Sequence, residues 1–443
     1  MNIQYFQNVY RNLLSFIFIY NRKLESKLKS GFYLRIRKFL SILLLVFGVG
    51  LVFFAPALSI FFLTTCLLVL TENENKRIHI FVYIMLAFNL SIIHSSRGVL
   101  SSPNDDMNFY YTEIYKSSFF DQLNVWKASP VEPLIFLFIS FLRVITFNLS
   151  PAGLMFIFTF TTSLMLLYGV IKLSKNVLNN KIEPIVVSAT LLSFGYFYST
   201  QLVRQQFSMV FALVALVLVK NGSKKGILLW LTSLSFHLGS LLYLFIVTLS
   251  ERITKLKIYI AVLFGFFSLL IFLFLAILNS ELYSHLEKIP LLLYKFKFYH
   301  DKYQLSNLME LKLSIISQHD TMFLTSYLFL ILFSVLLNFN KLNNFEFRLF
   351  IGVFILYVLF LPFTLFGFRL SLFVTSVLFG FYKVWTFQKI SILLRVYVLF
   401  KILTLCYFLN YSYKKLGKDG MEIFNQFPPY SGEFLYYLKS FII

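Results

Sequence analysis

Four short motifs combine ionisable side chains with aromatic rings, and each one lies at the end of an apolar run. They are NDDMNFYYTEIY (104–115), QLVRQQFS (201–208), SFHLGS (235–240) and FGFRLS (366–371). Carboxylates can accept a proton from a reacting hydroxyl group, and arginines can hold phosphoryl oxygens through paired hydrogen bonds. Because ionisable groups near membrane depth are costly, these motifs predict a polar functional site at one face of a membrane.

The rest of the chain is apolar enough to exclude a soluble domain. Hydrophobic residues make up 58% of the sequence, and the mean hydropathy is +0.77. The apolar runs are continuous, as in 39–54 and 258–278, whereas membrane barrels alternate apolar and polar positions. Each run approaches the ~20 residues that cross a bilayer as a helix. The sequence therefore predicts an all-α polytopic integral membrane protein with about 11–14 transmembrane helices.

The basic residues responsible for the net charge of +21 do not form a separate basic domain. The basic residues lie between the runs, which argues against nucleic acid as a partner. Because they crowd the first 38 residues, we expect residues 1–38 to be cytoplasmic. Residues 39–409 then form a single transmembrane domain, with outer loops at about 95–130 and 279–320. The tail, 410–443, is expected on the periplasmic side.

Charge also predicts the path of the chain through the membrane. Pro56 divides residues 39–71 into two short helices that turn at Ala55-Pro56. Residues 131–147 are expected to lie in or beside the outer leaflet as a juxtamembrane or re-entrant helix, because a full crossing would put Lys172, Lys175 and Lys181 outside. Residues 226–250 are expected to form two short helices with His237 at their outer apex. The other expected spans are 78–94, 152–172, 185–201, 205–220, 258–278, 322–337, 347–366, 370–385 and 392–409.

This topology brings a set of ionisable residues to the outer face, although none of them was used to choose that face. The set comprises Arg97, Asp105, Asp106, Glu132, Arg204, His237 and Arg369. Simpler roles remain open for several of them. The two aspartates could form a turn or cap a helix, Arg204 could extend to the lipid headgroups, and His237 could bond between helices.

The order of these motifs resembles the EpsG-type branch of bacterial polysaccharide polymerases, the Wzy-like enzymes of O-antigen and capsule assembly. The resemblance covers about residues 75–375. It rests on Asp106 with Tyr110, Glu132-Pro133, Phe197-Tyr198-Ser199 with Arg204-Gln205, Phe236-His237 and Arg369-Leu370. One feature departs from the family pattern. Members commonly place a small residue after Arg-Gln, where this chain has Gln206 and Phe207 before Ser208.

The resemblance implies a glycosyltransferase at the periplasmic face of the bacterial inner membrane. It would move a growing glycan from undecaprenyl pyrophosphate onto a lipid-linked repeat unit. Asp105 or Asp106 would act as the base, with His237 as a further catalytic residue. Substrate would be bound by Arg97, Tyr110, Glu132, Arg204, Gln205 and Arg369. Of these, Arg204 and Arg369 would hold the pyrophosphate, because a guanidinium matches phosphoryl oxygens with paired hydrogen bonds. Aromatic residues near the acids, including Phe109, Tyr111 and Trp126, would offer stacking faces to sugars.

Two other functions remain open. An O-antigen ligase, or another transferase acting on lipid-linked sugars, would use similar chemistry at the same face. A flippase for these lipids would show similar halves, and no internal repeat is visible. No nucleotide-binding motif is present, and one adjacent aspartate pair does not predict a metal, so no cofactor is expected. The expected partners are the bilayer, the lipid-linked oligosaccharides, a chain-length regulator and a flippase. Cys66 and Cys406 lie within apolar runs and are expected to be packing residues.

Overall fold

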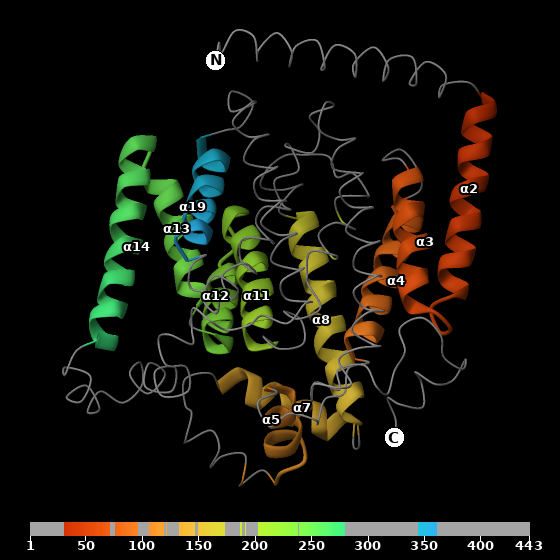
Figure 1. The fold of residues 1–443 in the computed structure, drawn as a ribbon, viewed down its shortest axis with the longest axis horizontal. Coiled ribbons are helices and arrows are strands. Elements are labelled where there is room, and N and C mark those ends of the chain that lie inside the picture. Colours follow the sequence, from red (N-terminus) through yellow and green to blue (C-terminus); the bar gives the residue numbers. More distant parts are fainter. Residues whose placement is uncertain are drawn as a thin grey trace.

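The structure is a computed structural model that describes residues 31–70, 76–95, 106–118, 133–146, 149–172, 203–237, 239–279 and 344–360, with Asp121, Val187 and Leu191. Every described element is a helix, which confirms the predicted fold class (Figure 1). The helices are α2 (Gly31–Gly50), α3 (Pro56–Val69), α4 (Lys76–Ser95), α5 (Asp106–Phe109), the π-helix η1 (Tyr110–Tyr115), α7 (Pro133–Thr146), α8 (Pro151–Lys172), α11 (Val203–Lys220), α12 (Lys225–Phe236), α13 (Ser240–Arg252), α14 (Leu256–Asn279) and α19 (Asn344–Phe360).

Three of the described helices, α4, α8 and α11, are long and apolar enough to cross a membrane. In Figure 1, α2, α3 and α4 stand on one side of the bundle and α13, α14 and α19 on the other, with α8, α11 and α12 between them. The main buried core joins α3, α4, α8, α11, α13, α14 and α19. The described helices therefore form a bundle around one long apolar core.

The predicted hairpin at Ala55-Pro56 is confirmed. Residues 51–54 form a turn, and α3 begins at Pro56, where proline suits the first helical position because no backbone N–H is needed there. Cys66 is buried in α3 and its thiol donates to the backbone oxygen of Ser41 at 3.3 Å. The sequence predicts a packing role for this cysteine, and it has one. Helix α2 begins at Gly31, within the basic N-terminal segment and before the expected start at residue 39.

The two short helices predicted within 226–250 are also present. They are α12 and α13, and the chain turns between them at His237. The expected spans 78–94, 152–172, 205–220 and 258–278 correspond to α4, α8, α11 and α14, and the first part of 347–366 corresponds to α19. Five other predicted segments lie outside the described residues apart from single positions: the spans 185–201, 322–337, 370–385 and 392–409, and the tail from 410. So does the loop 279–320 beyond Asn279.

Helix α7 has the features predicted for residues 131–147. It has only 14 residues, and Figure 1 shows it with α5 at one end of the bundle, beyond the ends of α11 and α12. One side of α7 buries Ile135, Ile139 and Leu142, while Phe141 and Val144 are exposed. An apolar helix with one face on protein and the other uncovered suits the boundary between a bundle and lipid. The end of the bundle that carries α5 and α7 is therefore the face predicted to be the outer one.

Helices α11 and α12 are joined by a run of small residues. The Ser233 hydroxyl donates to the backbone oxygen of Ser208 at 2.7 Å, and the Ser208 hydroxyl donates to that of His237 at 3.1 Å. Towards the other end, Gly226 lies against Val219 and Ala215. Small residues let membrane helices approach closely and bond across the interface. Ser208 thus supplies the small contact residue that the family pattern places two positions earlier.

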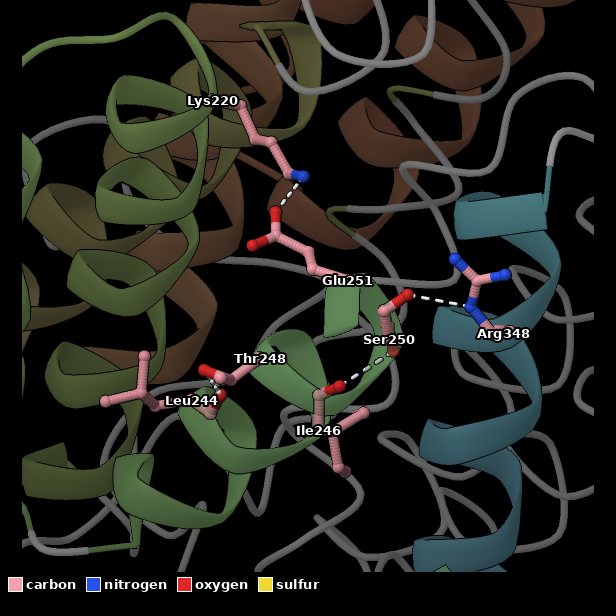
Figure 2. Close-up of polar contacts among 7 residues, drawn as sticks. All are labelled: Lys220, Leu244, Ile246, Thr248, Ser250, Glu251 and Arg348. Carbon is pink, nitrogen blue, oxygen red and sulfur yellow. Dashed lines mark hydrogen bonds and ion pairs between the residues drawn. The ribbon is translucent and has the colours of Figure 1, made fainter. Parts of the chain in front are cut away.

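Polar contacts at the opposite end of the bundle tie α11, α13 and α19 together (Figure 2). Lys220, the last residue of α11, pairs with Glu251 near the end of α13, and its ammonium lies 3.9 Å from the ring centre of Phe345. Arg348 is only 7% exposed, and its Nε donates to the backbone oxygen of Ser250 at 2.7 Å. The last carbonyls of a helix carry partial negative charge and lack helical partners. Arg348 therefore caps α13 and fixes α19 against it.

The close approach at Gly226 predicts a steric test of the α11–α12 contact. A Cβ at this position would lie 2.8 Å from the backbone nitrogen of Val219 and 3.0 Å from the backbone oxygen of Ala215. Because backbone cannot move aside easily, Gly226→Ala should lower the free energy of unfolding by about 1–3 kcal/mol. Gly265→Ala is the matched control, since nothing lies within 4 Å of its added Cβ. Thermal unfolding in detergent measures both, and equal melting temperatures would contradict the tight contact.

Candidate functional site

Residues 106–115 of the first polar motif form a helix, where the sequence predicted part of an outer loop. Asp106 opens α5, and at Tyr110 the helix continues with the wider turns of a π-helix. Such π-helical turns are rare and often occur at functional sites. Tyr110 is 1% exposed, and its ring packs edge-on against Phe158 of α8 at 6.4 Å between ring centres. Tyr110, the first residue of the π-helix, is therefore buried against α8.

Arg204 meets Tyr110 at this position. It is the second residue of α11, it is half-buried, and its guanidinium carbon lies 6.0 Å from the centre of the Tyr110 ring. A cation is attracted to the face of an aromatic ring, more strongly where water is excluded. Phe207, one turn further along α11, packs on Phe158 at 5.8 Å and stacks on Phe236 at 5.2 Å. We call Tyr110, Phe158, Phe207 and Phe236 the aromatic cluster. The arginine packs on this cluster through the ring of Tyr110.

His237 lies where α12 ends, on the helix that packs against α11. Its backbone oxygen accepts the Ser208 hydroxyl, and Ser208 is one turn from Arg204. Its Nδ1 accepts the backbone N–H of Gly239 at 2.9 Å. An N–H can donate only to an unprotonated ring nitrogen, so the neutral ring carries its proton on Nε2. In this geometry His237 is a hydrogen-bond donor through Nε2, and its Nδ1 is engaged in holding the turn.

Tyr111 has a role that differs from the predicted one. The sequence suggested that its ring could stack on sugar, but the ring is buried and stacks on Tyr115 at 5.6 Å between centres. The Tyr111 hydroxyl donates to the backbone oxygen of Leu149 at 3.1 Å, and the Leu149 N–H donates to the Tyr115 hydroxyl at 2.9 Å. These two tyrosines bind the link between α7 and α8, because their four-residue spacing puts both on one side of η1. They position the site and do not line it.

The described residues contain only part of the predicted site. Tyr110, Arg204, Gln205 and His237 gather around the outer ends of α11 and α12, and Gln205 is buried. Asp106 is described at its backbone only. Arg97, Asp105, Glu132 and Arg369 lie outside the described residues, although Pro133 begins α7 as the Glu-Pro motif predicts. In the described part of the chain, no three side chains of His, Cys, Asp and Glu come together as metal ligands do.

The arrangement favours binding of an anionic or hydroxyl-bearing group. Arg204 supplies a permanent positive charge with several N–H donors, and the Nε2 of His237 supplies a neutral donor from the neighbouring helix. The buried ring of Tyr110 limits the contact of the arginine with water on one side, which strengthens its attraction for an anion. Both donors depend on the same α11–α12 contact at Ser208. The described site therefore suits a group rich in oxygen acceptors, such as a phosphate ester.

Comparison with known proteins gives one match. A family model described as the EpsG family matches residues 103–431, which is well over half of the chain and includes every described residue of the site. No curated protein and no solved structure matches.

The bond between His237 and Gly239 predicts how the turn responds to substitution. In His237→Asn, the Asn side-chain oxygen can accept the N–H two residues ahead, as it does in common Asx turns, so the melting temperature should stay close to that of the native chain. In His237→Leu no acceptor remains, and stability should fall by about 1 kcal/mol. Thermal unfolding of the two purified variants measures this difference. Equal melting temperatures would mean that the Nδ1 bond does not hold the turn.

Proposed function

Because this chain belongs to the EpsG family, we propose that it polymerises a bacterial surface polysaccharide from lipid-linked repeat units. Membership of the family indicates a glycosyltransferase of the polysaccharide-polymerase type, acting within a membrane. The specific proposal is that the donor is a growing glycan on undecaprenyl pyrophosphate. The acceptor is the non-reducing sugar of a new repeat unit on the same kind of lipid.

The proposed reaction needs three chemical functions. The bond between the donor's anomeric carbon and the pyrophosphate oxygen breaks, and a bond forms from that carbon to a hydroxyl oxygen of the acceptor. The hydroxyl proton passes to a base, and undecaprenyl pyrophosphate leaves with the bonding electron pair. A base at the acceptor typically contributes ~10²–10⁴-fold to the rate, and positive charge at the leaving group stabilises the transition state further.

The contact of Arg204 with Tyr110 is the observation that supports this proposal most strongly. It gives a cation held against an aromatic ring at the end of the bundle predicted to face outwards. A guanidinium matches pyrophosphate oxygens with paired N–H donors and keeps its charge at any physiological pH. We therefore assign Arg204 to the leaving group. His237 would donate through Nε2 to the same pyrophosphate or to a substrate hydroxyl.

The remaining roles rest on sequence and on the family. Asp106 opens α5 one turn before Tyr110, so Asp106 or its neighbour Asp105 is the proposed base. Arg97 and Arg369 would bind pyrophosphate beside Arg204. Glu132 and Gln205 would bind sugar hydroxyls, because carboxylate and amide oxygens accept from them. Tyr110 would act by holding Arg204 in position.

The proposed setting is the bacterial inner membrane. The N-terminus would be cytoplasmic and the C-terminus periplasmic, and the product would be O-antigen, capsule or exopolysaccharide. A flippase that supplies repeat units and a chain-length regulator are the proposed partners. O-antigen ligases and flippases act on related lipids, so the experiment must separate them from a polymerase.

Deletion followed by complementation makes that separation. Cells without this chain should lose polymer but keep a single repeat unit on the lipid anchor. Native chain should restore the full glycan ladder, and Arg204→Lys should slow polymerisation by ~10²–10³-fold, because lysine offers a point charge where arginine offers a two-pronged donor. The glycan ladder, read at matched membrane abundance, is the measurement. Arg143→Lys on α7 is the control, an arginine at the same end of the bundle for which we propose no catalytic role.

Two results would contradict the proposal. Complete loss of surface glycan on deletion, including the single repeat unit, would indicate a ligase or a flippase. A full ladder from Arg204→Lys would leave the arginine with only the role of anchoring α11 at the headgroups, where lysine serves equally well.

A further inference from the structure

Two amide side chains lie in the apolar interior near the site. Asn89 of α4 is 0% exposed and Gln206 of α11 is 1% exposed. Neither the Nδ2 nor the Oδ1 of Asn89, nor the Nε2 of Gln206, has a hydrogen-bond partner in the described part of the chain. Buried polar atoms are paired in most structures, and leaving one unpaired costs about 1–3 kcal/mol. These two amides therefore lower the stability of the fold, which points to a role for them other than packing.

The residues next to both amides in the chain pack on the same segment of α8. Phe88, next to Asn89, packs on Phe156 at 5.3 Å and on Phe160 at 5.9 Å between ring centres. Phe207, next to Gln206, packs on Phe158 at 5.8 Å. The contacts of α4 and α11 with α8 therefore meet within residues 156–160, in the outer half of that helix. This segment also carries the ring that supports Tyr110.

Apolar core residues lie one turn away from each amide on its own helix. Leu86 and Ile93, one turn before and one turn after Asn89, are buried core residues. Met209 and Val210, one turn beyond Gln206, belong to the same core. The nearby threonine hydroxyl of Thr159 is already bonded to the backbone of its own helix. Both amides are thus polar groups within the buried core, and Gln206 lies on α11 within one turn of Arg204, whereas Asn89 lies on α4.

The chemistry of an amide indicates which ligand would complete these groups. Asn89 presents a donor and an acceptor, and both lack a partner in the described chain. A pyrophosphate has only acceptor oxygens when ionised, so it would leave the Oδ1 of Asn89 unmatched. A sugar hydroxyl or acetamido group both donates and accepts, so it would satisfy the Oδ1 and the two NH₂ groups together. Neutral amides also avoid the cost of placing a charge at this depth.

We infer that Asn89 and Gln206 form a sugar-binding subsite between α4, α8 and α11, which takes the sugar next to the pyrophosphate held by Arg204. The inference rests on the proposed function and extends it to the glycan part of the substrate. The amides are unpaired without substrate and become paired when α4 and α11 separate along α8 to admit the sugar. The unpaired amides destabilise the substrate-free state, which favours separation of the helices. They also favour a sugar that can pair with them over one that cannot.

This subsite predicts opposite effects on stability and on activity. Asn89→Leu and Gln206→Met replace each amide by an apolar side chain of similar size, which removes an unpaired buried group. Both variants should unfold at the same temperature as the native chain or higher. Both should produce at least about tenfold less polymer at matched abundance, the loss expected when hydrogen bonds to a substrate are removed. Few structural roles would raise stability while lowering activity.

Thr64→Val on α3 is the matched control. The Thr64 hydroxyl is also buried without a partner in the described chain, but it lies on a helix that carries no proposed site residue. This variant should gain stability in the same way and keep the full glycan ladder. A loss of polymer from Thr64→Val would show that removing any buried polar group impairs the enzyme, and it would overturn the assignment of the two amides.

A binding measurement separates this inference from the proposed function. Purified chain is heated with undecaprenyl pyrophosphate, or with lipid-linked repeat units extracted from cells that lack the chain. Native protein should be stabilised by both lipids, whereas Asn89→Leu should be stabilised only by undecaprenyl pyrophosphate. Equal stabilisation of the variant by both lipids, normal polymer, or a lower melting temperature without lipid would overturn the subsite. Failure of the repeat units to stabilise even the native chain would count against the proposed function itself.

Discussion

The contact between α11 and α12 at Ser208 is the interaction on which the rest of the site depends. Two serine hydroxyls bond across the helices to backbone oxygens, one of them the carbonyl of His237. Lipid offers no competing hydrogen-bond partner, so these bonds hold the two helices in one register. Arg204, one turn before Ser208, and His237, at the end of α12, then occupy the same end of the bundle. A shift of either helix would separate the two proposed donors.

Aromatic packing between the helices held in this register places a ring against the arginine. Three members of the aromatic cluster come from α8, α11 and α12, and the fourth, Tyr110, comes from η1. The paired tyrosines of η1 fix the link between α7 and α8, which prevents η1 from moving away. At the opposite end, Arg348 and Lys220 use charge to bind α19 and α13 to the same bundle. These charged contacts of Lys220 and Arg348 lie at the end of the bundle opposite the candidate site.

Much of the fold could be predicted from the sequence because the solvent is lipid. Apolar runs locate helices within a few residues, as for α8 and α11, and the polar motif at 235–240 correctly separates α12 from α13. Charge indicated that α7 lies at the outer end, since basic residues follow α8. Each of these predictions depends only on the order of apolar runs and charges along the chain.

Contacts between distant parts of the chain could not be predicted in this way. The tyrosines of η1 bond to Leu149, more than thirty residues away, and depend on a π-helix that no spacing rule indicates. Arg348 bonds to Ser250, which is almost a hundred residues away in the chain. In the sequence, Arg348 is only one more basic residue near a predicted span. Within the candidate site, the sequence identified Tyr110, Arg204 and His237. It did not identify the pairing of Arg204 with the tyrosine ring or the proton on Nε2, because both are set by packing.

Reconstitution of the purified chain in lipid vesicles tests the central claim most directly. The vesicles contain only lipid-linked repeat units, and the lipid-bound glycans and the released undecaprenyl pyrophosphate are measured over time. The account predicts glycans that lengthen by whole repeat units, with one undecaprenyl pyrophosphate released for each linkage formed. Repeat units that remain single in the presence of folded chain, with no pyrophosphate lipid released, would contradict it.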